Sequence, residues 1–275
     1  MGRPPAAIDP KHLRSLAAEL SDEEIASRLG CARVTVTSAR RRHRIPSFTE
    51  RTGLKRRGGQ VTYGGRRRSV LFQEDFFSEL DTQEKAYFLG LLAADGSVAR
   101  RGNTIEIQLA EPDEHILHKM VACIEGSGCV VRPHRRADRV KTFHRLTLCS
   151  KQMAEDLRSW GLTPGKTENF EIRRPIPQEQ LRHFVRGFWD GDGSVGRNHF
   201  EVGIRSQAFA LEMRSMIARI GGERPPLRQG ATRLGNPFYV IAVASRRFDC
   251  FRRELYRDAR CFLYRKHSRF QEFWS

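Results

Sequence analysis

The 275-residue sequence lacks several features that define whole classes of protein. Its longest apolar stretch, residues 86–94, is less than half of the roughly 20 residues that a membrane-spanning helix needs. Its first ten residues contain no apolar core of a secretion signal. The six cysteines include no C-x-x-C pair, which argues against a zinc ribbon and against a disulfide scaffold. We therefore expect a cytoplasmic protein with reduced thiols.

Acidic residues are also fewer than basic residues. The chain has 49 Lys and Arg against 32 Asp and Glu, which gives a formal net charge of +17 and a pI near 10.4. Its hydrophobic content of 39% still suffices for a buried core of ordinary size. This positive excess indicates a polyanionic partner, and it favours nucleic acid over a membrane surface. We expect the protein to be associated with the nucleoid when it is bound to DNA.

The positive charge is concentrated where hydrophobicity is low. Residues 46–79 contain several glycines and few apolar side chains, which is typical of a linker. Basic clusters separated by glycines suit an extended chain that follows a phosphate backbone and becomes ordered on binding. A flexible tether is the alternative. The basic residues expected to contact DNA in the linker and just before it are Arg40, Arg41, Arg42, Lys55, Arg56, Arg57, Arg66, Arg67 and Arg68.

Residues 1–45 contain the pattern of two short helices joined by a tight turn. Ser21 followed by Glu24 is a capping box that begins one helix, and Gly30 ends that helix. A second helix begins near Ala32. The segment is therefore predicted to form a small helical unit of its own.

The second of these helices carries the features of a DNA-binding element. Val34 and Val36 are expected to face inward. The spacing of Ala26, Gly30 and Val36 resembles the helix-turn-helix of DNA-binding regulators. A plain helical hairpin is the alternative. The residues left for solvent or for a DNA groove are Arg33, Thr35, Thr37, Ser38 and Arg40.

An internal repeat occupies the rest of the chain. Residues 87–98 and 184–195 are apolar stretches that both end in Asp-Gly-Ser-Val, and they lie 97 positions apart. Gly90 and Gly187 each precede another small residue by four positions, a spacing that lets two helix backbones approach closely. After each stretch, the hydrophobic pattern predicts two strands, a helix, two strands and a helix. The sequence thus predicts two similar lobes.

The aspartates of the repeat, Asp95 and Asp192, occupy an unfavourable position unless a cation is present. A carboxylate in the last turn of a helix faces the negative end of the helix dipole, at a cost of about 0.3–1 kcal/mol. Packing two such helices together adds repulsion between the acids. A hard divalent cation such as Mg²⁺ reverses the balance, because it prefers oxygen ligands and keeps waters that can attack a phosphate. Two lysines, Lys166 and Lys266, follow the two acids at similar distances.

The two segments resemble the paired signatures of the LAGLIDADG homing endonuclease family. The resemblance implies an α+β fold of two pseudo-symmetric αββαββα lobes, residues 80–176 and 177–275. Their two four-stranded antiparallel sheets would form a saddle over the DNA major groove, alongside the small all-α helix-turn-helix unit. It also implies that the signature helices pack together through Gly90 and Gly187.

The resemblance further implies a metal site at the ends of the signature helices. Asp95 and Asp192 match the metal-binding acids of the family, and the main-chain carbonyls of Ala94 and Gly191 match further ligands. Mg²⁺ is the expected cofactor, and Mn²⁺ is expected to substitute for it.

Other positions match residues around the family's reaction site. Lys166 and Lys266 match basic residues that polarise water or stabilise charge developing on the phosphate. Gln207 matches a residue that positions water. Ala93 stands where many members have an acid, which the second copy keeps as Asp190. Because this position is usually structural, Ala93 is expected to cost no activity.

The predicted strands supply side chains that point away from the core. Arg and Gln at such positions suit the base edges of the major groove, and their mixture with acids indicates recognition beyond backbone attraction. The alternative is the ordinary polar face of any sheet. The residues expected to contact bases are Gln108, Arg132, His134, Arg145, Arg205, Arg228 and Gln229.

Together these observations predict a site-specific, double-strand DNA endonuclease (meganuclease) that hydrolyses phosphodiester bonds with a divalent metal. Because both copies of the repeat lie in one chain, we expect a monomer that recognises a long, asymmetric site without an obligatory protein partner. Two alternatives remain. One is an RNA maturase that assists intron splicing, and the other is a DNA-binding regulator that uses the same surface without cutting.

Overall fold

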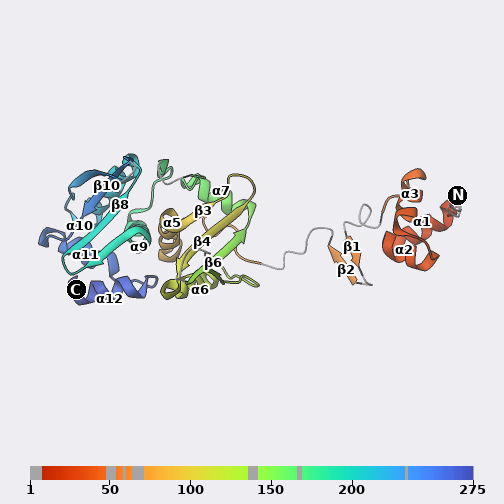
Figure 1. The fold of residues 1–275 in the computed structure, drawn as a ribbon, viewed down its shortest axis with the longest axis horizontal. Helices are drawn as coiled ribbons and strands as arrows, with labels where there is room; N and C mark the ends of the chain where they lie inside the picture. The colour runs from red at the N-terminus through yellow and green to blue at the C-terminus, as the bar shows by residue number, and fades with distance from the viewer. Residues whose placement is uncertain are drawn as a thin grey trace. The chain divides into compact units, whose positions relative to one another are not determined.

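The computed structural model describes residues 8–47, 54–57, 60–63, 71–135, 142–165, 169–232 and 235–274 (Figure 1). It divides into two compact units, Met1–Ser69 and Val70–Ser275. Within the described residues, no helix is long and apolar enough to cross a membrane.

Among its described residues, the smaller unit contains helices α1 (Pro10–Glu19), α2 (Asp22–Leu29) and α3 (Arg33–Arg42). The capping box forms: the Ser21 hydroxyl oxygen accepts from the Glu24 N–H, and the Ser21 N–H donates to the Glu24 carboxylate. Gly30 ends α2 with φ +62°, a left-handed conformation that favours glycine. A small separate core joins the helices through buried side chains that include Leu13, Ile25 and Val36.

Two of the predictions for α3 are wrong. Val36 is fully buried, but Val34 is 70% exposed. Residues two apart on a helix are separated by about 200°, so both cannot face the same core. Arg40, predicted to face solvent or DNA, is buried because it lies four residues after Val36 on the inward face. Its guanidinium pairs with the carboxylate of Asp22 at 2.6 Å and donates to the Ile45 carbonyl at 2.8 Å.

The linker contains a regular element that the sequence did not predict. Strands β1 (Leu54–Arg57) and β2 (Gln60–Tyr63) pair as an antiparallel hairpin. Lys55, Arg56 and Arg57 lie on β1. The cluster Arg66, Arg67 and Arg68 lies outside the described residues.

The larger unit repeats one order of elements twice, which confirms the predicted fold class. The first copy comprises α5 (Gln83–Asp95), β3 (Gly96–Val98), β4 (Thr104–Ala110), α6 (Glu114–Cys123), β5 (Arg132–Arg135), β6 (Thr142–Cys149) and α7 (Lys151–Ser159). The second comprises α9 (Leu181–Asp192), β7 (Gly193–Gly196), β8 (His199–Ile204), α10 (Gln207–Gly221), β9 (Leu227–Ala231), β10 (Pro237–Ala242) and α11 (Asp249–Tyr256), followed by α12 (Tyr264–Trp274). Short 3-10 turns, Glu111–Asp113, Gln178–Gln180 and Arg246–Phe248, precede α6, α9 and α11.

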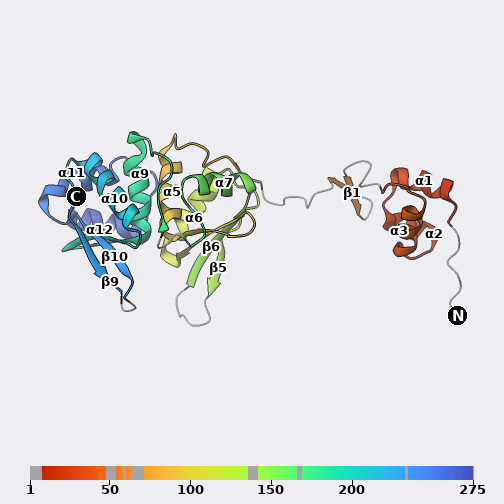
Figure 2. The same ribbon diagram turned by 90° about the horizontal axis from the view of Figure 1, so that it is seen from above.

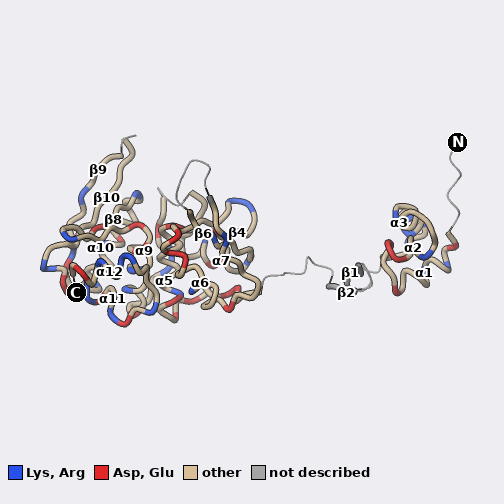
Figure 3. The backbone as a smooth tube through the Cα atoms, turned by 60° about the horizontal axis from the view of Figure 1, so that its bottom comes forward, with Lys and Arg blue, Asp and Glu red and all other residues tan. Residues whose placement is uncertain are grey.

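Each copy builds one four-stranded antiparallel sheet, in the orders β3-β4-β6-β5 and β7-β8-β10-β9. Helices α5 and α9 lie side by side at the centre of the unit, between the two sheets (Figures 1 and 2). The β9–β10 hairpin and strands of the first sheet project toward the same side of the unit (Figures 2 and 3). Both lobes of the larger unit therefore present strands on one shared side (Figures 2 and 3).

The core of the larger unit begins earlier than the predicted linker boundary. Phe76 and Phe77, placed in the linker by composition, are buried with the residues of α5. Phe72 packs against the same core. Three aromatic side chains within six residues are thus part of the folded body.

Candidate active site

The site is built on the packing of α5 against α9. A Cβ added to Gly90 would collide with the Phe184 carbonyl oxygen and lie 2.8 Å from the Phe188 nitrogen. A Cβ added to Gly187 would collide with the Tyr87 carbonyl oxygen and lie 2.9 Å from the Leu91 nitrogen. Tyr87 and Leu91 are the counterparts of Phe184 and Phe188 in the repeat, so the two contacts exchange under the 97-residue shift. Glycine at both positions permits a close, pseudo-twofold approach of the helices.

This approach continues to the C-terminal ends of the helices. A Cβ on Gly191 would collide with the Cβ of Ala94 and lie 2.9 Å from Oδ2 of Asp95. That oxygen is therefore within roughly 8 Å of the Asp192 Cα atom, because consecutive Cα atoms are about 3.8 Å apart. Asp95 and Asp192 are both exposed and are the last residues of their helices. The structure thus brings the two aspartates to one end of the helix pair, which we call the helix tip.

Lys266 lies behind the helix tip rather than on its surface. It is 4% exposed, and its ammonium donates to the carbonyls of Trp189 at 2.9 Å, Gly191 at 3.1 Å and Gly193 at 2.6 Å. These carbonyls belong to the end of α9, where helix carbonyls have no partner within the helix. Burial lowers the pKa of Lys266 to about 8, opposed by the negative charge of Asp190 and, more weakly, of the two tip aspartates.

An ammonium has three N–H donors, and the three carbonyls accept all of them. This arrangement differs from the expectation that Lys266 polarises water directly. Lys266 instead donates hydrogen bonds to the main chain at the end of α9, the helix whose last residue is Asp192. Its counterpart Lys166 lies outside the described residues.

A buried polar network beneath the helix tip was not predicted from the sequence. Asp190 is fully buried and accepts hydrogen bonds from the hydroxyls of Tyr87 at 2.8 Å and Tyr256 at 3.0 Å. It also accepts from the Leu263 N–H at 2.9 Å. Burial raises the pKa of Asp190, and the positive charge of Lys266 opposes this shift. The structural role expected for this acid thus involves donors from both lobes.

A second buried charge, Arg186, fixes the chain that leads to Lys266. Its guanidinium donates to the carbonyls of Cys261 and Leu255, both at 2.9 Å. Arg186 and Asp190 stand four positions apart inside an otherwise apolar segment. That pair of opposite charges on one buried helix face was the signal in the sequence that could have predicted this network.

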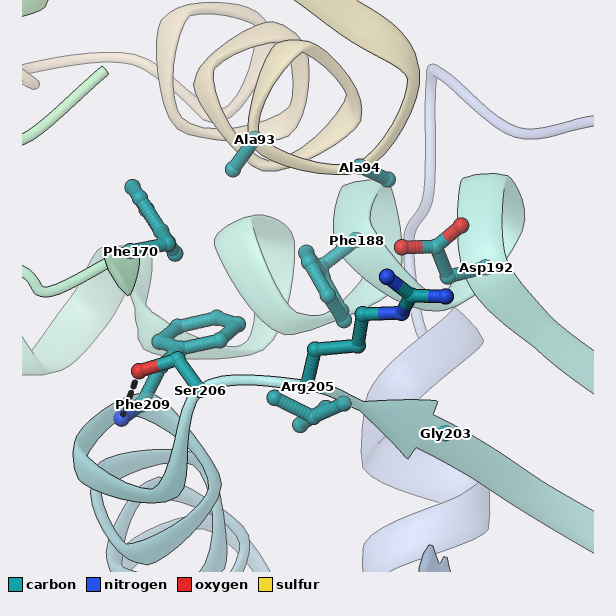
Figure 4. A pocket seen from close by; sticks show the side chains of 10 residues that line it. Ala93, Ala94, Phe170, Phe188, Asp192, Gly203, Arg205, Ser206 and Phe209 are labelled. Carbon is teal, nitrogen blue, oxygen red and sulfur yellow. Dashed lines mark hydrogen bonds between the residues drawn. The ribbon is translucent and has the colours of Figure 1, made fainter. Parts of the chain in front are cut away.

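A cavity of about 230 Å³ opens beside Asp192 (Figure 4). Phe188 and Phe209 line it, and Ala93 lies across from them on α5. The side chain of Arg205 points toward Asp192 (Figure 4). Gln207, exposed at the start of α10, directly follows Ser206, which lines the cavity.

The donor set at the helix tip suits a hard cation. Carboxylate and carbonyl oxygens are the ligands that Mg²⁺ prefers, and Mg²⁺ usually keeps several waters. Among the described residues, no group of three or more His, Cys, Asp and Glu side chains is arranged to hold a metal. A cation here would therefore rely on the two aspartates, main-chain oxygens and water. The Gly191 carbonyl already accepts one hydrogen bond, from Lys266.

The outer face of the first sheet carries a polar row across three strands. Arg145 on β6 pairs in register with Gln108 on β4 and with Arg132 on β5. The Arg145 guanidinium lies 3.3 Å from the Glu106 carboxylate and 3.5 Å from the Gln108 side-chain oxygen. His134, two positions after Arg132, lies on the same side of β5.

The second sheet separates two residues that the sequence analysis grouped together. Arg228 pairs with Val240, which pairs with the exposed Gly203 on the outer face. Gln229 instead pairs with Tyr239, a buried residue of the opposite face. Consecutive strand residues point to opposite faces, so Arg228 and Gln229 cannot share one surface.

Residues 179–255 match the family described as LAGLIDADG-like domain. Two curated proteins of Methanocaldococcus jannaschii are similar to part of the chain. They are the DNA-directed RNA polymerase subunit Rpo1C, 26% identical over 46% of this chain, and the replication factor C small subunit, 24% identical over 65%. The chain spans only 14% and 9% of these proteins.

Solved structures give the following similarities. The homing endonuclease I-DmoI in complex with DNA and Ca matches 66% of this chain and 90% of its own, at 15% identity and TM-score 0.46. The N-terminal LAGLIDADG domain of DUF199/WhiA matches 72% and 93%, at 12% identity and TM-score 0.46. The DNA-bound homing endonuclease I-WcaI matches 71% and 90%, at 9% identity and TM-score 0.43.

Proposed function

We propose that the protein is a site-specific, divalent-metal-dependent DNA endonuclease, a proposal supported by the match of residues 179–255 to the LAGLIDADG-like domain family. The observation that carries the proposal is the convergence of Asp95 and Asp192 at one exposed helix tip. Carboxylates at the C-terminal ends of two packed helices repel each other and face the negative ends of the helix dipoles. A bound divalent cation would offset both effects and could also hold a phosphodiester oxygen.

In this proposal, the carboxylates of Asp95 and Asp192 hold Mg²⁺, or Mn²⁺ in its place, with the Ala94 and Gly191 carbonyls as further ligands. When bound, the cation supplies charge neutralisation at the phosphate and a more acidic water. Lys266 holds the end of α9 by its hydrogen bonds and so fixes the position of Asp192. Because Lys266 is 4% exposed, it would act through α9 rather than by contact with the nucleic acid.

The cationic side chains around the helix tip would act on the DNA rather than on the metal. Arg205 points toward Asp192 and is exposed, so a phosphate held at the tip lies within reach of its guanidinium (Figure 4). Gln207, exposed at the start of α10, would orient a water. In the first lobe, Lys166 is proposed to polarise water or to stabilise the charge that develops on the phosphate.

The DNA would lie along the side to which both sheets project. Arg132 and Arg145 on the first sheet and Arg228 on the second contribute positive charge there. The net charge of +17 makes affinity strongly dependent on salt. Because one chain supplies both lobes, a monomer would suffice for both strands of an asymmetric site.

The smaller unit and the linker would extend the contact with DNA. On α3, Arg33, Ser38, Arg41 and Arg42 are exposed. Thr35 and Thr37 are partly buried, and the Thr37 hydroxyl donates to Asp22 at 2.8 Å. We propose that the exposed residues of α3 contact DNA, together with the basic residues of β1 and the linker.

The experiment is incubation of the purified chain with a randomised duplex DNA library, with Mg²⁺ and with EDTA, followed by sequencing of the ends. Recovery of one shared site cut on both strands, only with Mg²⁺, supports the proposal. Specific binding without cutting in either condition would favour a regulator. Binding of structured RNA with no cleavage of DNA would favour a maturase.

A further inference from the structure

The most exposed large apolar side chain among the described residues is Val34, at 70%. It lies on α3, where the buried Val36 and Arg40 occupy the opposite side. A single exposed apolar residue is ordinary on a protein surface. Its neighbours on the helix make this one informative.

Val34, Ser38 and Arg41 are all exposed and follow the spacing i, i+4, i+7. Residues at this spacing form one stripe on the surface of a helix. The stripe has an apolar end at the beginning of α3, a hydroxyl in the middle and a cation at the far end. We call Val34, Ser38 and Arg41 the α3 stripe.

The surroundings of the stripe select its ligand by charge. Arg33 and Arg42 flank it and are also exposed, and α3 contains no acid. The acids of the first turn of α2 lie on the neighbouring helix, where Asp22 is committed to Arg40 and Thr37. The exposed surface of α3 is therefore cationic with one apolar contact point.

In the DNA major groove, thymine is the base that presents an apolar group, its C5-methyl. Serine hydroxyls hydrogen-bond to several base edges, and arginine suits guanine or phosphate. We propose that α3 enters the major groove and that Val34 recognises a thymine by contact with its C5-methyl group. This inference rests on the proposed binding of DNA by the smaller unit, and it adds a specific base and a specific atom.

The test uses the full chain and does not depend on cleavage. A preferred duplex is selected by binding in EDTA, and each thymine in its footprint is replaced singly by deoxyuridine, which removes only the methyl group. The wild-type chain should lose affinity about fourfold at one or two thymines, the value expected for one buried methyl-sized group. Val34→Ala should bind the thymine duplex and the deoxyuridine duplex with equal affinity. That affinity should match the affinity of the wild-type chain for the deoxyuridine duplex.

Two further variants make the result specific. Val34→Ile keeps an apolar contact and should keep the deoxyuridine penalty. Leu211→Ala removes another exposed apolar side chain from a helix of the larger unit and should also keep it. Alanine is a better helix former than valine, so unfolding of α3 is not expected in Val34→Ala, and thermal unfolding checks this.

Three outcomes overturn the inference. The first is that Val34→Ala retains the same deoxyuridine penalties as wild type, the second is that no thymine in the footprint shows a penalty, and the third is that no DNA is bound specifically. If the wild-type chain shows the deoxyuridine penalty but does not cleave DNA in Mg²⁺, the proposed nuclease activity is contradicted and the role of Val34 is not. Cleavage without any deoxyuridine effect would contradict the role of Val34 alone.

Discussion

The hydroxyl of Tyr87, on the helix of the first lobe, donates a 2.8 Å hydrogen bond to the carboxylate of Asp190, on the helix of the second. Both residues are fully buried. The same carboxylate oxygen accepts from the Leu263 N–H, in the segment that leads to Lys266. One buried acid thus ties the two lobes to each other and to the chain that holds the helix tip.

Removal of the Tyr87 hydroxyl should therefore destabilise the larger unit. Tyr87→Phe leaves a buried carboxylate with one donor fewer, so the free energy of unfolding should fall by about 1–3 kcal/mol. Urea unfolding measures this change. Tyr264→Phe is the matched control, because the Tyr264 side chain is exposed and the change should be close to zero. Equal stability of the two variants would contradict the role assigned to Asp190.

Adding a methyl group at the helix crossing should separate the two aspartates. Gly187→Ala forces a Cβ against the Tyr87 carbonyl, which should cost about 1–3 kcal/mol of stability and reduce DNA cleavage. The control is Gly203→Ala, where a Cβ meets no described atom within 4 Å. Its stability should stay within about 0.5 kcal/mol of wild type. Wild-type unfolding and cleavage by Gly187→Ala would show that close approach is not required.

Lys266→Met should impair cleavage through the end of α9 rather than through DNA binding. The substitution leaves three carbonyls without their ammonium donor, so we expect a loss of about 1–3 kcal/mol in unfolding free energy. DNA affinity should change little, because Lys266 is buried. Lys151→Met, which removes an exposed lysine, serves as the control for lost charge. Full stability with lost cleavage would instead indicate direct contact of Lys266 with the reacting groups.

Stability should decrease as the pH falls below about 6.5. Burial, together with the charges of Arg186 and Arg182, lowers the pKa of His183 from 6.5 to about 3. Its Nε2 atom lies 3.4 Å from the Arg182 Nε donor, and Nδ1 has no partner among the described residues. Between pH 6.5 and about pH 3, His183 is protonated in the unfolded chain but not in the folded chain. Each pH unit of decrease therefore lowers the free energy of unfolding by up to about 1.4 kcal/mol.

Urea unfolding between pH 7 and pH 5 measures the effect, and His183→Asn should reduce the slope. The remaining slope is assigned to His267, whose pKa burial also lowers. An unchanged slope in His183→Asn would show that His183 is not the group responsible.

Local patterns in the sequence predicted most of the fold. The capping box at Ser21 and the repeated element order depend on hydrophobic periodicity and on neighbouring residues, and both appear in the structure. The packing of Gly90 and Gly187 also depends on one spacing repeated at two places. Each of these features depends on a short local pattern, and in the larger unit that pattern recurs 97 positions later.

For features that depend on tertiary contacts, the sequence-based predictions were either absent or wrong. Arg40 looked like a groove-facing cation, but its partner Asp22 lies on another helix, and only packing brings them together. The hydroxyl donors of Asp190 lie 103 and 66 positions away, and its main-chain donor lies 73 positions away. Lys266 was found at the site by its place in the repeat, whereas its burial could not be inferred from sequence spacing.

The most direct test of the central claim is double-strand cleavage of the selected DNA site by Asp95→Asn and Asp192→Asn in Mg²⁺, with DNA affinity measured in parallel. Asp258→Asn is the control, because Asp258 is exposed and its left-handed φ of +53° is well tolerated by asparagine. Each tip variant should lose cleavage by roughly 100-fold or more while binding the site as tightly as wild type. Undiminished cleavage by either variant would contradict the claim that the two aspartates form the active site.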